Sequence, residues 1–371
     1  MYFRLNPECY FIKGVKLGAI YDIIDCEIYH LDETETELLR NAEKNIPISD
    51  NSFFNTLNEK CLGNFYESPP YIQKLREGSR NMFDELDLPI LIENVFLEIT
   101  NKCNLTCSFC GDIVKRSKGC MGCNKFNNEK DTNLNLSKIM EVIDDLGRLK
   151  CQNLFIKGGD LTLNWDITLK VIDYAKDKFL NVIITLHESQ YCEEIFSEIK
   201  DKVKVIVQVD TINNVENLDK SCLILLMSYD GGDLSDLYNE YFIEQDFIFD
   251  DDVKNFTFPS TDYHNFTKNL EYHPCLANSL AIASNGDVLP CIMMRTDILG
   301  NIYENRVYEI IHNNFKYIDN FWRLNLDKIN RCKNCEFRYA CDDCRALEKS
   351  KNNKLFSKTT CKYNPDVGNF D

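Results

Sequence analysis

The sequence contains no long hydrophobic run. Nowhere do about 18 uncharged apolar residues follow one another, as a membrane-spanning helix requires. The amino-terminal segment MYFRLNPECYF also lacks the apolar core of a secretory signal. These absences predict a soluble, cytoplasmic protein with no membrane partner.

An excess of basic charge is missing as well. The 371 residues include 42 Lys and Arg against 59 Asp and Glu, which gives a formal net charge of −17. This charge repels the phosphates of a nucleic-acid duplex, so we expect no nucleic-acid partner. Repeats and low-complexity segments are also lacking, and 44% of the residues are hydrophobic, which excludes a disordered chain.

Cysteine, by contrast, is abundant, with 18 residues. A chain of 43.3 kDa can bury a core without disulfides, and in a reducing cytosol grouped cysteines usually bind metals. The spacing of the cysteines therefore decides their role.

The middle of the sequence alternates between strand and helix patterns. This alternation predicts an α/β fold with a parallel sheet, either open or a partial barrel. Ser137 is the expected cap of the first helix, and Asp166–Lys178 and Tyr191–Lys200 are the expected second and third helices. The expected strands are Val95–Ile99, Asn153–Lys157, Val182–Leu186, Val203–Val209, Leu223–Ser228 and Phe247–Phe249.

Alternation stops near His273, where the composition favours a loop-rich metal-binding region. The predicted domains are residues 1–88, 89–255 and 256–371.

The first cysteine group directly follows the first strand of the alternating region. Cys103, Cys107 and Cys110 have the spacing C-x3-C-x2-C. Three thiolates can hold three irons of a 4Fe–4S cluster and leave the fourth iron without a protein ligand. The alternative is a zinc knuckle completed by Cys120 or Cys123.

This strand and motif resemble those of the radical S-adenosylmethionine (SAM) enzymes, with Phe109 at the family's aromatic position. The resemblance implies a partial (β/α)6 barrel and hydrogen abstraction by a 5′-deoxyadenosyl radical. Gly158-Gly159-Asp160 resembles the family's Gly-Gly-Glu element, which receives the SAM amino group; Asp for Glu is a departure, and a simple turn is the alternative. Gln208 is the implied partner of the SAM ribose, and Thr185 is a further candidate; ordinary polarity at strand ends is the alternative for both.

A second, larger cysteine group lies in the carboxy-terminal region. Its order and spacing, with Gly286 between the first two members, resemble the SPASM domain, which follows the barrel in many peptide-modifying radical SAM enzymes and holds two auxiliary 4Fe–4S clusters. Paired structural zinc sites are the alternative. The resemblance implies Cys332, Cys335, Cys341 and Cys361 as ligands of the outer cluster, and Cys275, Cys291 and Cys344 as ligands of the inner one.

The inner set lacks a fourth cysteine. Relatives with a closed inner cluster take it from just upstream of the position of Cys275, and residues 260–274 contain none. Either His264, His273 or Tyr263 replaces it, or an open iron remains that could bind a substrate thiolate.

Ile292 follows Cys291, at the position where sulfatase-maturing relatives carry an Asp that serves as the base. This absence argues against oxidation to formylglycine. Together with an open inner iron, it favours a thioether cross-link from a peptide Cys to carbon. Carbon–carbon cross-linking and epimerisation stay open.

Cys120 and Cys123 form a CxxC on a polar loop beside the expected active site. They could bind metal, exchange with a substrate thiol or only secure the loop, and we favour a structural or incidental role.

The first 85 residues resemble the winged-helix module that binds leader peptides in pathways for ribosomal natural products (RiPPs). Expected strands at Tyr10–Lys13, Leu17–Ile24 and Glu27–His30 precede a helix that starts near Asp32. The resemblance implies a precursor peptide whose leader adds as a strand at Glu27–Leu31. An extension that merely packs on the barrel is the alternative.

The sequence thus predicts an oxidoreductase with three 4Fe–4S clusters, SAM and an external donor of flavodoxin or ferredoxin type. Two further hypotheses are maturation of a folded protein without leader recognition and a non-catalytic zinc or iron–sulfur interaction protein.

Overall fold

The largest sheet of the protein consists mainly of parallel strands. In the computed structural model the described residues are 1–49, 52–76, 91–107, 110, 119–123, 125–126, 129–209, 215, 218–226, 242–243 and 261–370. Nine strands within these ranges form the central sheet, in the order β11-β10-β9-β8-β7-β6-β12-β13-β14. Neighbours from β11 to β12 pair in parallel, and β12, β13 and β14 pair antiparallel. The strands are β6 (Asn94–Thr100), β7 (Asn153–Gly158), β8 (Asn181–His187), β9 (Lys204–Val209), β10 (Leu223–Leu226), β11 (Phe242–Ile243), β12 (Ser279–Ile282), β13 (Asp287–Leu289) and β14 (Gly300–Asn301).

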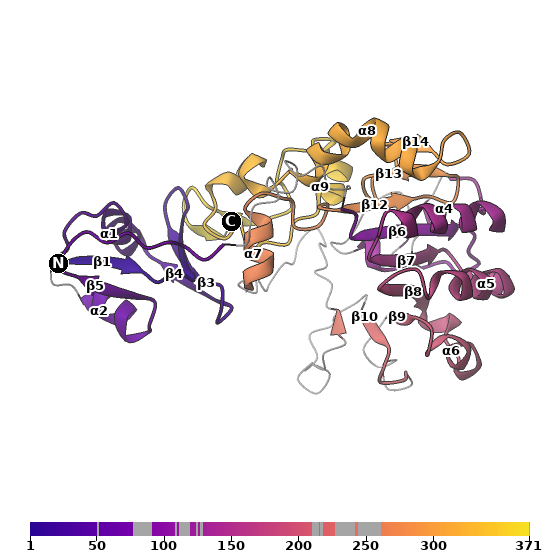
Figure 1. The fold of residues 1–371 in the computed structure, drawn as a ribbon, viewed down its shortest axis with the longest axis horizontal. Helices are drawn as coiled ribbons and strands as arrows, with labels where there is room; N and C mark the ends of the chain where they lie inside the picture. The colour runs from indigo at the N-terminus through magenta and orange to yellow at the C-terminus, as the bar shows by residue number, and fades with distance from the viewer. Residues whose placement is uncertain are drawn as a thin grey trace.

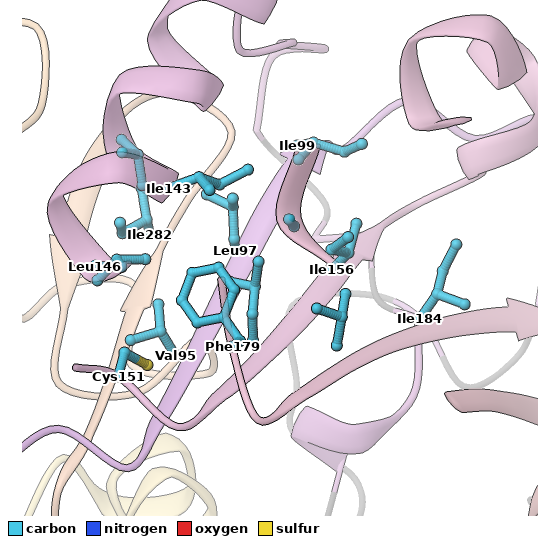
Figure 2. Packing of buried hydrophobic residues seen from close by; sticks show 14 of the residues in the cluster. Val95, Leu97, Ile99, Ile143, Leu146, Cys151, Ile156, Phe179, Ile184 and Ile282 are labelled. Atoms are coloured by element: carbon cyan, nitrogen blue, oxygen red, sulfur yellow. The ribbon is translucent and has the colours of Figure 1, made fainter. Parts of the chain in front are cut away.

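Helices cover one face of the central sheet (Figure 1). α4 (Leu136–Arg148), α5 (Trp165–Ala175) and α6 (Glu193–Ile199) connect successive parallel strands, and α8 (Val307–Trp322) packs against α4. Alternate strand residues point to these helices, as the two-residue period of a strand requires. Figure 2 shows Val95, Leu97 and Ile99 of β6 beside Ile143 and Leu146 of α4 in the resulting apolar core.

These observations confirm the predicted α/β class. The first four expected strands agree with β6 to β9 within two residues at each end, and β10 coincides with the fifth up to Leu226. Counted from β6 along the chain, the sixth strand is β11. It precedes the expected Phe247–Phe249, which lies outside the described residues. The helix predicted from Ser137 begins earlier, because the side chain of Asn135 accepts the Lys138 amide at 2.8 Å and caps α4.

The sequence does not predict that the sheet continues into the cysteine-rich region. β12 pairs in parallel with the free side of β6, and the hairpin of β13 and β14 extends it further. Four residues are too few to show a strand pattern among the neighbouring loops. The described carboxy-terminal region also contains α7 (Tyr263–Asn269), α9 (Arg345–Asn352), β15 (Tyr363–Asn364) and β16 (Asn369–Phe370).

The amino-terminal part forms a module with its own core. Its elements are β1 (Tyr2–Leu5), β2 (Cys9–Lys13), β3 (Gly18–Asp22), β4 (Glu27–Leu31), α1 (Glu33–Glu43), α2 (Ser52–Glu59) and β5 (Gly63–Tyr66). The three expected strands form the antiparallel sheet β2-β3-β4, and Asp32 caps α1 in a capping box with Glu35. The separate pair of β1 and β5 was not predicted.

This module packs against the carboxy-terminal region, on the side away from α5 and α6 (Figure 1). Tyr10 and Tyr21 contact Phe266 of α7, with ring centroids 4.6 and 5.4 Å apart. The Tyr21 hydroxyl donates to the Glu336 carbonyl at 2.8 Å, and the Val15 amide donates to the Asn334 carbonyl at 2.8 Å. These contacts join the amino-terminal module to the carboxy-terminal region.

Candidate functional site

The first cysteine group lies at the carboxyl end of β6, next to the end of β7. The Gly159 amide donates to the Thr100 carbonyl at 3.0 Å, and the Asp160 amide donates to the Lys102 carbonyl at 2.7 Å. A β-carbon at Gly159 would lie 2.5 Å from the Lys102 carbonyl oxygen, so only glycine allows this approach. The two motifs that the sequence singled out are therefore in direct contact.

Within this group, Cys103 lies beside Cys110 and Asp160, and burial raises the pKa of the Cys103 thiol. The Leu105 amide points at Cys103 Sγ at 3.4 Å. Amide donors of this kind stabilise thiolate ligands of iron–sulfur clusters. Phe109 lies outside the described residues, so its expected contact with SAM stays a prediction.

Asp160 is buried at the mouth of the site and caps the turn that follows. Its Oδ1 accepts the Thr162 amide at 2.9 Å and the Thr162 hydroxyl at 2.6 Å. One carboxylate oxygen of Asp160 is therefore used to hold the turn. This use agrees with the departure from the family's Glu, which makes a direct contact of the acid with SAM less certain.

His187, which the sequence did not single out, ends β8 and faces Cys107. Its Nδ1 accepts the Ser189 amide at 3.2 Å, and its Nε2 lies 3.8 Å from Cys107 Sγ. With Nδ1 used as an acceptor, the ring proton belongs on Nε2, where it can donate to the sulfur. The predicted strand ended at Leu186, one residue short of this histidine.

The CxxC loop, residues 119–123, crosses the carboxyl ends of β7, β8 and β9. The buried Lys157 ammonium donates to the Gly122 carbonyl, and the Thr185 hydroxyl donates to the Met121 carbonyl at 2.9 Å. Thr185 thus anchors the loop, and its proposed contact with SAM would compete with this bond.

Gln208 lies below the same loop and is fully buried. Its Oε1 accepts from Cys123 Sγ at 3.6 Å, whereas its Nε2 has no hydrogen-bond partner among the described residues. A buried amide nitrogen without a hydrogen-bond partner is unfavourable unless a ligand accepts its hydrogen bond. Gln208 therefore fits a role toward SAM.

The four cysteines of the expected outer group are brought together. Cys332 and Cys361 each interact electrostatically with both Cys335 and Cys341. Burial raises the pKa of Cys332 to about 12, and the Phe337 amide points at Cys335 Sγ at 3.4 Å. Buried thiols of raised pKa ionise when a metal replaces their protons, so the group fits a cluster with four protein ligands.

A buried charge network lies beside the outer group. Asp343 accepts from His273 Nε2 at 3.1 Å, from Lys358 Nζ at 3.0 Å and from Arg345 Nη2 at 2.6 Å. Burial alone would raise the pKa of Asp343, but the charge of Lys358 and the bonds from His273 and Arg345 hold it well below its usual range. Lys358 and Arg345 also place positive charge next to Cys332.

The expected inner group is also brought together, with one addition. Cys275, Cys291 and Cys344 lie within electrostatic range of one another, and Cys120 of the CxxC loop makes a hydrogen-bond contact with the Cys275 thiol. Cys275 has exposed surface, yet it lies so deep that the contact with Cys120 and the loss of water both raise its pKa.

Two of the residues proposed to replace the missing cysteine are used elsewhere. His273 Nδ1 accepts the amides of Cys275 and Leu276, both at 3.0 Å, and its Nε2 faces Asp343. Tyr263 packs in the cluster that joins α7 to the amino-terminal module. The third, His264, is on an exposed position of α7.

No group of three or more His, Cys, Asp or Glu in the described ranges is arranged to hold a metal ion. The fit of both cysteine groups to a multinuclear cluster rests instead on the number, depth and mutual proximity of their thiols.

A pocket of about 310 Å³ lies next to the inner group. Met293 and Met294, which follow Cys291, line one side, and Ala346, which follows Cys344, lines another. Arg295 enters the lining with its guanidinium 2.6 Å from Glu98 Oε2 and 2.7 Å from Glu129 Oε2. Ile292 instead points into an apolar cluster with Ala281 and Leu289, in agreement with the expected lack of a base there.

The described residues include no helix that is both long and apolar enough to cross a bilayer.

Comparison with known proteins identifies part of the chain. A family model described as an iron–sulfur cluster-binding domain, SPASM, matches residues 274–336. The expected SPASM domain is thereby confirmed. An uncharacterised protein of Methanocaldococcus jannaschii is 26% identical over 125 residues, which are 32% of this chain and 39% of that protein. The match therefore spans about two fifths of that relative.

Several solved structures align with most of the chain. SuiB of Streptococcus suis bound to S-adenosylmethionine is 14% identical, with 96% of this chain and 99% of SuiB covered and a TM-score of 0.48. BtrN in complex with AdoMet and 2-DOIA is 14% identical, with coverages of 70% and 96% and a TM-score of 0.43. The protein anSMEcpe with bound AdoMet is 14% identical, with coverages of 74% and 93% and a TM-score of 0.40.

Proposed function

With a SPASM iron–sulfur domain at residues 274–336 as the premise, we propose that the chain is a radical SAM enzyme that modifies a ribosomally synthesised precursor peptide. The observation that carries the proposal is the contact between the two motifs at the ends of β6 and β7. The amides of Gly159 and Asp160 bond to the carbonyls of Thr100 and Lys102, which places the Gly-Gly-Asp turn against the first cysteine group.

The residues present fit three clusters. Cys103, Cys107 and Cys110 would hold the one that binds SAM; when bound, this cluster and SAM together supply abstraction of a hydrogen atom from an unactivated carbon. The chain's own part is to orient SAM and exclude water. Gln208 offers its buried amide, while Gly158, Gly159 and Asp160 form the wall of the site. An external electron donor of flavodoxin or ferredoxin type completes the proposal.

Anaerobic reconstitution tests the proposal. The enzyme requires about twelve irons per chain and formation of 5′-deoxyadenosine that depends on a reductant. The variant with Cys103, Cys107 and Cys110 all changed to Ala should lose about four irons and all 5′-deoxyadenosine. Zinc without iron in the reconstituted protein contradicts the proposal and supports an interaction protein with structural zinc sites.

A peptide substrate is proposed from the amino-terminal module. β4 is a terminal strand of the sheet β2-β3-β4, and among the described residues no further strand pairs with its other side. An extended leader can add there through main-chain hydrogen bonds. The net charge of −17 would favour a basic leader.

Deletion of the module is a poor test of leader binding. The deletion would remove Tyr21 from Phe266 and from Glu336, and so expose apolar surface of the carboxy-terminal region. A single substitution on β4 keeps Tyr21, Phe266 and Glu336 in place, although Ile28 packs against the same cluster. Ile28→Pro blocks a main-chain donor on the edge strand and should weaken precursor binding at least tenfold while 5′-deoxyadenosine formation persists.

Lys16→Pro, on the exposed turn between β2 and β3, is the matched control. Equal precursor affinity for wild-type protein and Ile28→Pro contradicts leader binding at β4 and supports maturation of a folded protein.

The bond formed is proposed to be a thioether from a peptide Cys to carbon. This choice rests on Ile292, which leaves no base after Cys291, and on the expectation of an open inner iron. The contact of Cys120 with Cys275 favours a second candidate, a carbon–carbon cross-link. With a fourth thiol from the protein itself, the inner group has no open iron for a substrate thiolate.

The mass of a co-expressed precursor separates the two products. A mass loss of two hydrogen atoms with one cysteine blocked to alkylation supports a thioether. The same loss with all thiols free supports a carbon–carbon bond, and an unchanged mass supports epimerisation.

A further inference from the structure

The inner cysteine group receives a fourth thiol from a distant part of the chain. Cys275, Cys291 and Cys344 come from the carboxy-terminal region, and Cys120 comes from the CxxC loop that follows the first cysteine group. Cys120 makes a hydrogen-bond contact with Cys275 and lies within electrostatic range of the other two. Four thiols from three separate chain segments therefore lie close to one another.

The position of Cys120 is fixed by the residues on its carboxy-terminal side. The Met121 carbonyl accepts the Thr185 hydroxyl at 2.9 Å, and the Gly122 carbonyl accepts the Lys157 ammonium. The Met121 side chain packs on Ile183, Ile206 and Leu225 on the face of the sheet opposite to the helices. These contacts hold the loop across three strands, so the approach of Cys120 to the inner group does not depend on a mobile segment.

Cys120 itself packs against a small apolar cluster next to the inner group. This cluster contains Ala281 of β12, Leu289 of β13 and Ile292, which follows Cys291. Small side chains at Ala281 and Ala283 leave room for the loop to reach the cysteines. Because β12 pairs in parallel with β6, Phe96 of β6 packs against the same cluster as Cys120.

From this arrangement we infer that Cys120 is the fourth protein ligand of the inner auxiliary cluster and closes the site that the residues upstream of Cys275 leave incomplete. Its partner in the CxxC does not share this role, because Cys123 Sγ is directed to Gln208 Oε1 at 3.6 Å. His273 is excluded as the ligand because both of its ring nitrogens face other groups.

The inference rests on the proposed function for the identity of the metal group. It changes what the inner site can do. A cluster with four cysteine ligands has no position for a substrate thiolate, so its chemistry is electron transfer rather than binding.

The test uses the full chain with Cys103, Cys107 and Cys110 changed to Ala, so that only the auxiliary clusters are loaded. In this background, Cys120→Ala is compared with Cys123→Ala after anaerobic reconstitution. The probe is 2-mercaptoethanol, and the readouts are the electron paramagnetic resonance spectrum and the iron content per chain.

We expect the probe to change the spectrum of Cys120→Ala and to leave those of the parent and Cys123→Ala unchanged. Cys120→Ser, which offers an oxygen ligand of similar length, should show a shifted spectrum without the probe and guards against a folding defect in Cys120→Ala. Equal responses to the probe in the parent and in Cys120→Ala overturn the inference.

The two proposals fail in different ways. If the parent holds about eight irons and Cys120→Ala behaves as the parent, the inference is wrong and the proposed function stands. If the parent holds zinc and loses one zinc on Cys120→Ala but none on Cys123→Ala, the four-thiol site stands and the proposed function is wrong.

Discussion

Gly159 offers a direct test of how tightly the first cysteine group is held. A β-carbon there would lie 2.5 Å from the Lys102 carbonyl oxygen, 2.9 Å from the Asn101 carbonyl oxygen and 2.9 Å from Cys103 Cβ. Two of these atoms belong to the backbone and cannot rotate away. Gly159→Ala must therefore move the loop that carries Cys103.

The size of the effect follows from two terms. Overpacking against fixed atoms costs about 1–3 kcal/mol. The bonds from Gly159 to Thr100 and from Asp160 to Lys102, 3.0 and 2.7 Å long, would lengthen, and each contributes about 0.5–1.5 kcal/mol. We expect a loss of about 2–6 kcal/mol, seen as a fall in Tm of at least about 2 °C, and fewer irons at the first group.

Gly147→Ala is the matched control for this change. Gly147 lies in α4, where the nearest atom to a new β-carbon is Lys178 Cβ at 3.8 Å. Alanine is favoured over glycine in a helix by about 1 kcal/mol, so this variant should be slightly more stable than the parent. Equal melting temperatures for the two variants, with full iron content in Gly159→Ala, would refute the argument from close approach.

Three further predictions follow from single contacts. Asp343→Asn removes the carboxylate nearest to the buried Lys358 and Arg345 and leaves Lys358, among the described residues, only Glu348 at 3.5 Å, so it should lower stability by about 3–5 kcal/mol in thermal unfolding. The exposed Asp342→Asn should change stability by less than about 0.5 kcal/mol, and similar effects of the two variants would argue against the network. His187→Phe removes a donor to Cys107 and should lower the reduction potential of the first cluster in a redox titration. The control, His312→Phe on the exposed side of α8, should leave this potential unchanged. An unchanged potential in His187→Phe rules out the hydrogen bond. Lys157→Met releases the Gly122 carbonyl and should make the spectrum of the inner cluster respond to 2-mercaptoethanol as that of Cys120→Ala does. Lys204→Met, at an exposed position, is the control. If the spectrum of Lys157→Met does not respond, Thr185 alone holds the loop.

Local patterns predicted most of the sheet. The apolar runs of β6 to β9 are buried parallel strands, and Asp32 with Glu35 forms the capping box at the start of α1. Short elements carry too few residues for a pattern, so β12 and the pair of β1 and β5 were missed. For β12 the deciding interaction is its pairing with β6, nearly two hundred residues earlier in the chain.

The same limit applied to the candidate site. Spacing grouped the three cysteines of the first group, and the resemblance to the SPASM domain implied the four of the outer group. His187 was missed because the predicted strand ended at Leu186, one residue before the observed end of β8. Cys120 was noticed as half of a CxxC, but nothing in the spacing connects it with Cys275, and only the crossing of the loop over β7 and β8 does so.

The placement of Cys120 alters the argument about the reaction. The absence of a cysteine upstream of Cys275 suggested an open iron, and an open iron was one reason to expect a substrate thiolate and a thioether. If Cys120 closes the inner site, that reason disappears, and the choice of product passes to groups near the substrate. We propose the pocket beside Met293 and Arg295 as the place where specificity arises, since its lining combines apolar side chains with a guanidinium held by Glu98 and Glu129. Arg295→Leu should therefore change which precursor residue reacts without changing the iron content, whereas Cys120→Ala should change the spectrum of the inner cluster first.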